Sequence, residues 1–379
     1  PPYFQHNYFY VNQGDGTFSE DGDDRIGYVT IGDLETIATV ADLDNDGFPD
    51  IVISNNRSDS STFDIDSYIY WGSATGFSTS DRTELATRGS TSNSIADLNR
   101  DGWLDIVFCN TNTSETEYEI DSYIYWGSPS GFSESSREAL PTLGAYTSAI
   151  ADLNSDGELD IIFANWRNNS SYLVDSYIYW GSETGFSTGD RETLPNNGAT
   201  GVSVADLDHD GHLDIVFSNF RDDTDYLVDS RIFWGSATGY TSTDFATLET
   251  FGAVGNSIAD LDDDGYLDIV FSNHVHDTAT TDTLHEIDSP VYWGSAGDYS
   301  EDSSQLLATH GTTGNSILNI NNDGHLDILF FNTRDNTDYD VSSYFYMGNA
   351  DDLSEMCRVD LPVDGAFLGR HEDLGATMD

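Results

Sequence analysis

Residues 41–55 read ADLDNDGFPDIVISN, and close copies of this stretch recur along the chain. The copies are ADLNRDGWLDIVFCN, ADLNSDGELDIIFAN, ADLDHDGHLDIVFSN, ADLDDDGYLDIVFSN and LNINNDGHLDILFFN. They place the first residue of an acidic loop at Asp42, Asp97, Asp152, Asp206, Asp260 and Asn319, with spacings of 55, 55, 54, 54 and 59. A fixed period of this size is typical of a repeat architecture, in which every unit is one supersecondary element.

A second motif keeps the same period. It reads DSYIYWGSATGFS from Asp66 and returns at Asp121, Asp175, Asp229, Asp288 and, as SSYFYMGNADDLS, at Ser342. The N-terminal HNYFYVNQGDGTFS is this motif without its leading half, and HEDLGATMD carries a stub of the first motif at Asp373. Seven units of about 54 residues account for nearly the whole chain, so we expect a single domain over 1–379.

Each unit predicts four short strands, of the types NSIADL, LDIVFSN, SYIYWG and REALPTLG. The IVF runs are apolar at consecutive positions, which indicates a strand covered on both faces. Repeated four-stranded units are typical of propeller blades, so the fold class expected is all-β, a seven-bladed β-propeller. An array of β-sandwiches is the alternative, but it needs strands that change sheets within every unit. The extra residues of the fifth unit, between Asn273 and Asp288, predict a surface loop.

The two chain ends predict how the ring closes. The C-terminal GAFLGRHEDL matches the first strand of a seventh blade, and NYFYVN and RIGYVTIG match its third and fourth strands. We therefore expect the seventh blade to be closed by pairing of the N- and C-terminal segments. No segment matches its second strand. A trimmed chain, irregular terminal residues or a strand donated by a neighbouring molecule would each account for that gap.

The acidic loops follow the pattern D-x-[DN]-x-D-G-x-x-D, with side-chain oxygens at positions 1, 3, 5 and 9 and a backbone carbonyl at 7. Hard Ca²⁺ prefers six to eight such oxygens, and glycine at position 6 permits the tight turn. The predicted ligands are Asp42, Asp44, Asp46, Phe48 and Asp50; Asp97, Asn99, Asp101, Trp103 and Asp105; Asp152, Asn154, Asp156, Glu158 and Asp160; Asp206, Asp208, Asp210, His212 and Asp214; Asp260, Asp262, Asp264, Tyr266 and Asp268; Asn319, Asn321, Asp323, His325 and Asp327.

An EF-hand begins alike, but it requires a carboxylate at position 12 and flanking helices. Position 12 here is Ile53, Phe108, Phe163, Phe217, Phe271 or Phe330, inside a predicted strand. For a single loop, the alternative is an aspartate-rich turn held by its own side chains. Six copies in register disfavour that alternative, because clusters of carboxylates destabilise a fold in the absence of a cation.

The loops and their period resemble the FG-GAP/VCBS propellers of integrin α-subunits, some fungal lectins and many microbial surface proteins. The resemblance covers essentially all of the chain. It implies a calcium ion in each of the six loops, a seven-bladed ring, and a role in adhesion or sugar binding. Asn319 and Asn321 replace two acids in the sixth loop, so we expect weaker binding there. The stub at Asp373 lacks the glycine and later acids and is assigned no metal.

The charge balance is extreme: 68 acidic residues face 13 basic ones, all of them arginine, for a net charge of −55. Such a surface repels nucleic acid and anionic lipid, and no apolar run is long enough for membrane insertion. Six Ca²⁺ ions would offset only about a fifth of the excess. Adaptation to high salt is our interpretation of the remainder, and a chance property of an acidic secreted protein is the alternative.

Recurrent tryptophans predict packing between blades: Trp71, Trp126, Trp180, Trp234 and Trp293. Trp103 and Trp166 occur once each and are better candidates for ligand contact. The histidines of the fifth unit, His274, His276 and His285, predict a solvated polar loop rather than a transition-metal site. An asparagine ends the second strand of every unit and is interpreted as a turn former: Asn55, Asn110, Asn165, Asn219, Asn273 and Asn332.

The sequence contains no nucleophile elbow, P-loop, HExxH or Cys–His pairing, so we do not expect an enzyme. The function expected is an extracellular or cell-surface, calcium-stabilised module for adhesion or lectin-like recognition of a glycan or surface protein. One alternative is a structural subunit of an extracellular filament or surface layer that self-associates through an incomplete seventh blade. The other is a polysaccharide-degrading enzyme, which fold alone does not exclude.

Overall fold

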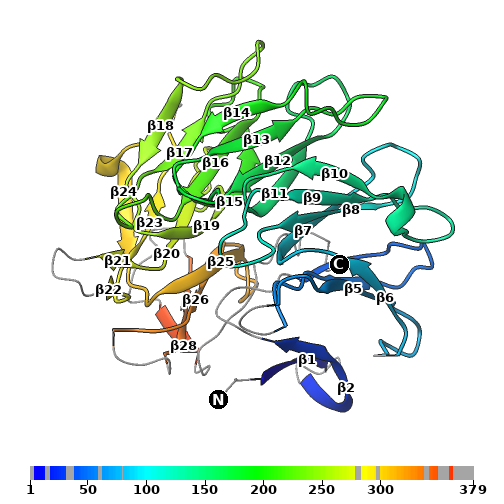
Figure 1. Ribbon diagram of the computed structural model, residues 1–379. Helices are drawn as coiled ribbons and strands as arrows, with labels where there is room; N and C mark the ends of the chain where they lie inside the picture. The colour runs from blue at the N-terminus through cyan, green and yellow to red at the C-terminus, as the bar shows by residue number, and fades with distance from the viewer. Residues whose placement is uncertain are drawn as a thin grey trace. The chain divides into compact units, whose positions relative to one another are not determined.

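A computed structural model describes residues 4–12, 18–30, 38–58, 62–78, 80–277, 283–295, 299–336, 341–348 and 358–361 (Figure 1). The chain divides into two compact units, Pro1–Gly144 and Ala145–Asp379. Regular structure in the described residues is β, apart from two three-residue 3₁₀ turns at Glu134–Ser136 and Glu301–Ser303. No helix in this part of the chain is long or apolar enough to cross a membrane.

The first unit contains a hairpin and two four-stranded sheets. The hairpin pairs β1 (Phe4–Asn12) with β2 (Phe18–Thr30). One sheet holds β3 (Ala38–Ala41), β4 (Asp50–Ile53), β5 (Asp66–Tyr70) and β6 (Arg82–Ala86). The other holds β7 (Ser90–Ala96), β8 (Asp105–Asn110), β9 (Asp121–Tyr125) and β10 (Glu138–Pro141).

The second unit contains four such sheets and a short ribbon. The sheets are β11 (Ala145–Ala151), β12 (Asp160–Asn165), β13 (Asp175–Tyr179) and β14 (Glu192–Pro195); β15 (Ala199–Ala205), β16 (Asp214–Asn219), β17 (Ser230–Phe233) and β18 (Phe245–Leu248); β19 (Ala253–Ala259), β20 (Asp268–Asn273), β23 (Ser289–Tyr292) and β24 (Ser304–Leu307); β25 (Thr312–Leu318), β26 (Asp327–Asn332), β27 (Ser343–Tyr346) and β28 (Arg358–Leu361). The ribbon pairs β21 (His276–Asp277) with β22 (Thr283–Leu284).

These six antiparallel sheets confirm the four strands predicted for each of the six complete repeats among the described residues. Their strands pair in chain order, and each sheet is named below by its second strand. NYFYVN and RIGYVT also form strands, β1 and β2, that pair with each other as expected. The segment GAFLGRHEDL lies outside the described residues. Closure through the chain ends and the count of seven blades therefore stay predictions.

Hydrophobic cores form between consecutive sheets of the same unit. On β16, Val216 packs with Ile269 and Phe271 of the next sheet. The residues on either side of it, Ile215 and Phe217, face the preceding β12 sheet instead. Because successive side chains of a strand point to opposite faces, an apolar run such as IVF fills two cores at once. All six residues of β16 are buried, which confirms a strand covered on both faces.

The recurrent tryptophans belong to these cores. Trp180 packs into the core between the β12 and β16 sheets, and its ring stacks on Tyr240 at 6.4 Å between centroids. Trp234 stacks on Tyr299 in the same way one repeat later. Trp71 and Trp293 pack against the corresponding cores of their own units. Packing between sheets is therefore confirmed for these four rings.

The asparagine that ends each second strand caps a backbone group, as the sequence predicted. Asn110 Nδ2 donates to the carbonyl of Asp121 at 2.8 Å, while its Oδ1 accepts from the N–H of Arg88 at 3.1 Å. The Nδ2 donation recurs from the five other asparagines to Asp66, Asp175, Asp229, Asp288 and Ser342. The side chain thus joins the second strand to the start of the third.

Arginines stack on aromatic rings across the third and fourth strands. The guanidinium of Arg137 lies 3.9 Å from the ring centre of Tyr123, and equivalent pairs are Arg82–Tyr68, Arg191–Tyr177 and Arg358–Tyr344. In the β16 sheet the two residue types have exchanged strands, so that Arg231 of β17 lies over Phe245 of β18. A planar guanidinium suits such stacking better than an ammonium does, which gives these bases a reason to be arginine.

The insertion of the fifth unit differs from expectation, because two of its three predicted histidines are not solvated. His285 is buried, and its Nδ1 lies 2.9 Å from the carbonyl of His274. The two rings meet edge to face at 5.2 Å, where the preceding units place Phe220–Tyr226 and Trp166–Tyr172. Burial lowers the pKa of His274 to about 4, with a further contribution from His285. The prediction of a solvated polar loop is therefore wrong for this pair, which packs in place of an aromatic pair.

A buried hydrogen bond ties neighbouring sheets together. Asn256 Nδ2 of β19 donates to Ser218 Oγ of β16 at 2.7 Å. One repeat later, Asn315 Nδ2 donates to Ser272 Oγ in the same way. One repeat earlier, the equivalent positions hold Ala164 and Val202, which share one apolar core. A polar pair or an apolar pair therefore satisfies this position, whereas a mixed pair leaves a buried polar group without its partner.

We expect Ser218→Ala and Asn256→Val each to lower the free energy of unfolding by about 1–3 kcal/mol, because each leaves the other polar group buried without its hydrogen-bond partner. The double variant recreates the Ala164–Val202 pair and should recover most of that loss. Chemical denaturation of the four proteins in a double-mutant cycle measures the coupling. Simple additivity of the two losses would contradict the pairing.

Candidate metal centres

Each acidic loop lies between the first and second strands of a sheet and has the same backbone conformation. The glycine at position 6 has a positive φ in all six loops, as expected from the sequence. Position 4 is also left-handed, with φ near +60° at Asn45, Arg100, Ser155, His209, Asp263 and Asn322. The sequence reading missed this second turn, although asparagine, aspartate and histidine tolerate such a φ better than most residues.

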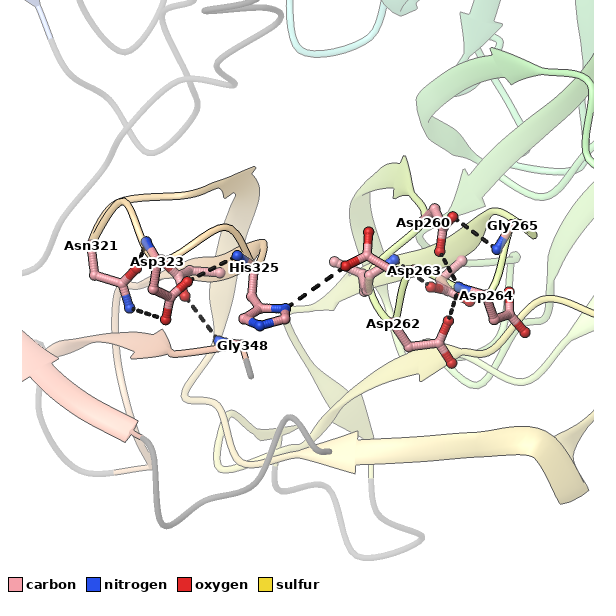
Figure 2. A network of polar contacts seen from close by, with 12 residues as sticks. Asp260, Asp262, Asp263, Asp264, Gly265, Asn321, Asp323, His325 and Gly348 are labelled. Carbon is pink, nitrogen blue, oxygen red and sulfur yellow. Dashed lines mark hydrogen bonds and ion pairs between the residues drawn. The ribbon is translucent and has the colours of Figure 1, made fainter. Parts of the chain in front are cut away.

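The carboxylates at positions 1, 3 and 5 are held by backbone N–H groups of their own loop. In the fifth loop the N–H of Asp264 donates to Oδ1 of both Asp260 and Asp262 at 3.1 Å, as Figure 2 shows. The N–H of Gly265 donates to Asp260 Oδ2 at 3.0 Å, and that of Tyr266 to Asp264 Oδ1 at 2.8 Å. These bonds fix the carboxylates in place and leave further lone pairs on their oxygens.

The aspartate at position 9 has a different role, because it is buried and both its oxygens accept hydrogen bonds. Asp105 Oδ2 accepts from the N–H of Leu98 at 2.9 Å, and its Oδ1 accepts from the N–H of Gly127 at 2.8 Å. Gly127 follows the third strand, so one carboxylate joins the loop to two strands. Each of the other five sheets repeats both bonds.

The partner of this carboxylate is a glycine because the backbone approaches it too closely for a side chain. A Cβ on Gly127 would lie 2.2 Å from the carbonyl oxygen of Leu104. The other sheets show the same approach, at 2.0–2.2 Å, for Gly72, Gly181, Gly235, Gly294 and Gly348. The recurrence of glycine after the third strand was visible in the sequence, but its link to the acidic loop was not.

Burial makes the carboxyl at position 9 a markedly weaker acid in four of the loops. Desolvation raises the pKa of Asp105, Asp160 and Asp214 to about 6 and that of Asp268 to about 7. The backbone N–H donors oppose this shift, while the loop's other carboxylates add to it. At neutral pH the carboxyls of Asp105, Asp160 and Asp214 are therefore mostly ionised and face further acids of their own loops, and a nearby cation would relieve that repulsion.

Three loops bring carboxylate oxygens within 4.8 Å of one another: Asp42, Asp44 and Asp50; Asp206, Asp208 and Asp210; Asp260, Asp262 and Asp268. In the other three loops the predicted set includes asparagine at position 3, so fewer acids converge. Two buried oxygens at position 1, Asp206 Oδ1 and Asn319 Oδ1, accept no hydrogen bond in the described structure. Unpartnered oxygens at the expected ligand positions fit a cation that prefers oxygen.

The other two candidate tryptophans differ in the contacts that the structure gives them. The backbone N–H of Trp103 donates to Asp101 Oδ1 at 2.9 Å, as the backbone N–H of position 7 does in the neighbouring loops. Trp166 packs against Tyr172 at 5.4 Å and Tyr146 at 6.1 Å between ring centres. The guanidinium groups of Arg167 and Arg221 also lie 4.5 and 4.6 Å from the centre of the Tyr172 ring. These rings pack against one another and the arginines, which leaves the glycan-stacking hypothesis for Trp166 without support from its contacts.

We expect Gly127→Ala to lower the free energy of unfolding by about 2 kcal/mol or more, because the new methyl group overlaps a backbone carbonyl. Gly189→Ala is the control, since its Cβ would meet only a serine hydroxyl at 3.5 Å. Thermal denaturation compares the two variants. A Gly127→Ala protein as stable as the control would show that the close approach is not required.

Comparisons with known proteins are consistent with this geometry. A family model described as an FG-GAP-like repeat matches three overlapping segments, 42–108, 97–163 and 152–217. No curated protein matches the chain. A mercury-soaked crystal structure of BBS1N in complex with ARL6DN matches with a TM-score of 0.52 at 11% identity, over 90% of this chain and 87% of that chain.

Two further solved structures match with lower scores. The lead-soaked crystal of the same BBS1N complex has a TM-score of 0.49 at 11% identity and covers 83% and 80% of the two chains. An Agrocybe aegerita lectin that recognises non-reducing terminal N-acetylglucosamine has a TM-score of 0.40 at 15% identity, with 81% and 75% covered. The likeness to BBS1N, a β-propeller, concerns the fold alone.

Proposed function

We propose that the acidic loops bind Ca²⁺ and that the calcium-loaded molecule is an extracellular recognition module, starting from the match of residues 42–217 to an FG-GAP-like repeat. The observation that carries the proposal is the unpartnered, buried oxygen of Asp206, set among the carboxylates of Asp208 and Asp210. A divalent cation would neutralise this cluster and take up the free oxygen.

The residues that would hold the ion are those of positions 1, 3, 5 and 9, with the backbone carbonyl of position 7. The loop is already closed by hydrogen bonds such as Gly211 N to Asp206 Oδ2 at 3.1 Å. Binding would therefore cost little backbone ordering, because the turn exists before the ion arrives. The sixth loop has the same backbone but only Asp323 and Asp327 as acids, which supports about six ions with the sixth held more weakly.

The location of the loops supports a stabilising role for calcium and a recognition role for other surfaces. Every acidic loop connects the first and second strands of its sheet, so within each sheet it lies at the start of the second strand. The connections after the second strands, which include Trp166, Phe220 and Leu227, lie at the other end. A rigid sheet framework with variable connections is the usual arrangement for binding a partner. Calcium is abundant outside cells, which suits a module stabilised in this way.

We further propose the seven-bladed arrangement for the whole chain. The hairpin of β1 and β2 supports it, because its strands match the third and fourth strands of the other sheets in sequence. The acidic surface supports a high-salt environment, in which dense carboxylates are screened. The partner favoured by the proposal is a glycan or a surface protein, rather than a nucleic acid or a lipid surface.

We expect calcium to raise the melting temperature by about 10 °C or more over protein in excess EDTA, since several native-state sites add their stabilisation. Asp206→Asn should reduce this gain, while Asp244→Asn, an exposed aspartate outside the loops, should leave it unchanged. Differential scanning calorimetry measures the shift. Identical melting curves in calcium and EDTA would contradict the calcium assignment.

The gain from calcium should also depend on pH. The folded-state pKa of Asp105, Asp160, Asp214 and Asp268 lies above the unfolded value of 3.8, so the cation-free protein loses stability as pH rises from about 4 through 6–7. Calcium must displace these protons at the lower end of the window. The same calorimetry should therefore give a smaller gain at pH 5 than at pH 7.5.

We expect a glycan array probed with labelled protein to show binding in millimolar calcium that EDTA abolishes. The physical reason is that recognition loops depend on a framework ordered by the ion. The unlabelled protein supplies a competition control. Absence of binding in both buffers, together with filaments in electron micrographs of the native protein, would contradict recognition of glycans and favour the structural subunit.

A further inference from the structure

The left-handed residue at position 4 reaches the next acidic loop along the chain. Asp263 Oδ2 of the fifth loop lies 3.8 Å from His325 Nδ1 of the sixth, and Figure 2 shows the two side chains pointing toward one another. His209 of the fourth loop stacks on Tyr266 of the fifth, with ring centres 5.6 Å apart and planes within 13°. Asn45 Nδ2 of the first loop donates a long bond, 3.5 Å, to the carbonyl of Gly102 in the second.

One end of each contact lies between two expected ligands, and the other end is an expected ligand or the glycine next to one. Position 4 lies between the ligands at positions 3 and 5, so for Asp263 the flanking residues are Asp262 and Asp264. The receiving residue is position 7, whose carbonyl is a ligand, or the glycine before it. His325 is such a residue, and its N–H donates to Asp323 Oδ1 at 2.9 Å. A single side-chain contact therefore links the residues around the expected ligands of one loop to those of the next.

We propose that position 4 couples neighbouring metal loops, so that calcium in the fifth loop strengthens binding in the sixth through Asp263 and His325. The inference rests on the proposed function, because it requires both loops to bind the ion. The backbone turn is already formed, so an ion held by Asp262 and Asp264 acts on the exposed side chain between them and limits the conformations that the Asp263 carboxylate samples. His325 then gains an ordered partner, and less ordering remains to be done when the sixth loop binds.

The sixth loop has the most to gain from this arrangement, since it contains the fewest acids. Asp263 also brings a negative charge to within 3.8 Å of the His325 ring, and that charge would attract an ion bound in the sixth loop. Its side chain is 73% exposed, and that of His325 is 31% exposed, so the contact is screened by water. The expected coupling is accordingly small, roughly a two- to fivefold change in calcium affinity.

Histidine NMR can follow the loops separately. The chain has nine histidines, of which His325 reports on the sixth loop and His212 on the fourth. Calcium titration of ¹³Cε1-histidine-labelled protein gives a midpoint for each. Asp262→Ala, which impairs the fifth loop, should raise the His325 midpoint roughly two- to fivefold in the native background. In the Asp263→Asn background the same substitution should leave that midpoint unchanged.

Asp263→Asn suits the test, because asparagine occupies the same left-handed position in the first and sixth loops. Ser155→Asn, at position 4 of the third loop, is the matched control and should not alter the His325 midpoint. Unchanged His212 shifts before calcium is added would show that the variants fold. An equal effect of Asp262→Ala in both backgrounds, or an effect in neither, would overturn the coupling. Calcium that moves no histidine signal at all would instead refute the proposed function.

Discussion

The buried carboxylate at position 9 is the interaction on which the repeat depends. In the second repeat Asp105 accepts one N–H from the acidic loop and another from Gly127 after the third strand. It therefore fixes the positions of the first three strands relative to one another. Burial of this group costs free energy when it is ionised, and the loop meets that cost with backbone donors and, in our account, with a cation. Folding and metal binding thus depend on the same carboxylate.

Differences among the repeats show which contacts between sheets are required in pairs. Ser218 with Asn256 is polar where Ala164 with Val202 is apolar. Arg231 and Phe245 exchange the strands that arginine and tyrosine occupy elsewhere. The pair His274–His285 replaces an aromatic pair with almost the same ring separation. In each case the geometry is kept while the chemistry changes, which indicates that backbone spacing and not residue identity is constrained.

The repeated motifs were sufficient to predict the strands and the acidic loops, because short apolar runs and loop spacing are local properties. They were not sufficient for contacts that link distant residues. The approach of Gly127 to Leu104 and the left-handed φ of Asp263 follow from three-dimensional closure. The histidines of the fifth unit were misjudged for a related reason. Their polarity suggested solvent, but the position they fill in the repeat is a packed one.

The central claim is that these loops hold calcium, and the number of ions bound tests it most directly. Protein dialysed against trace calcium and analysed by inductively coupled plasma mass spectrometry gives that number without any assumption about function. The account predicts about five tightly bound ions per chain, and a sixth that appears only at higher free calcium. A ratio near zero at millimolar free calcium would contradict it, because the buried carboxylates would then be stable without a cation.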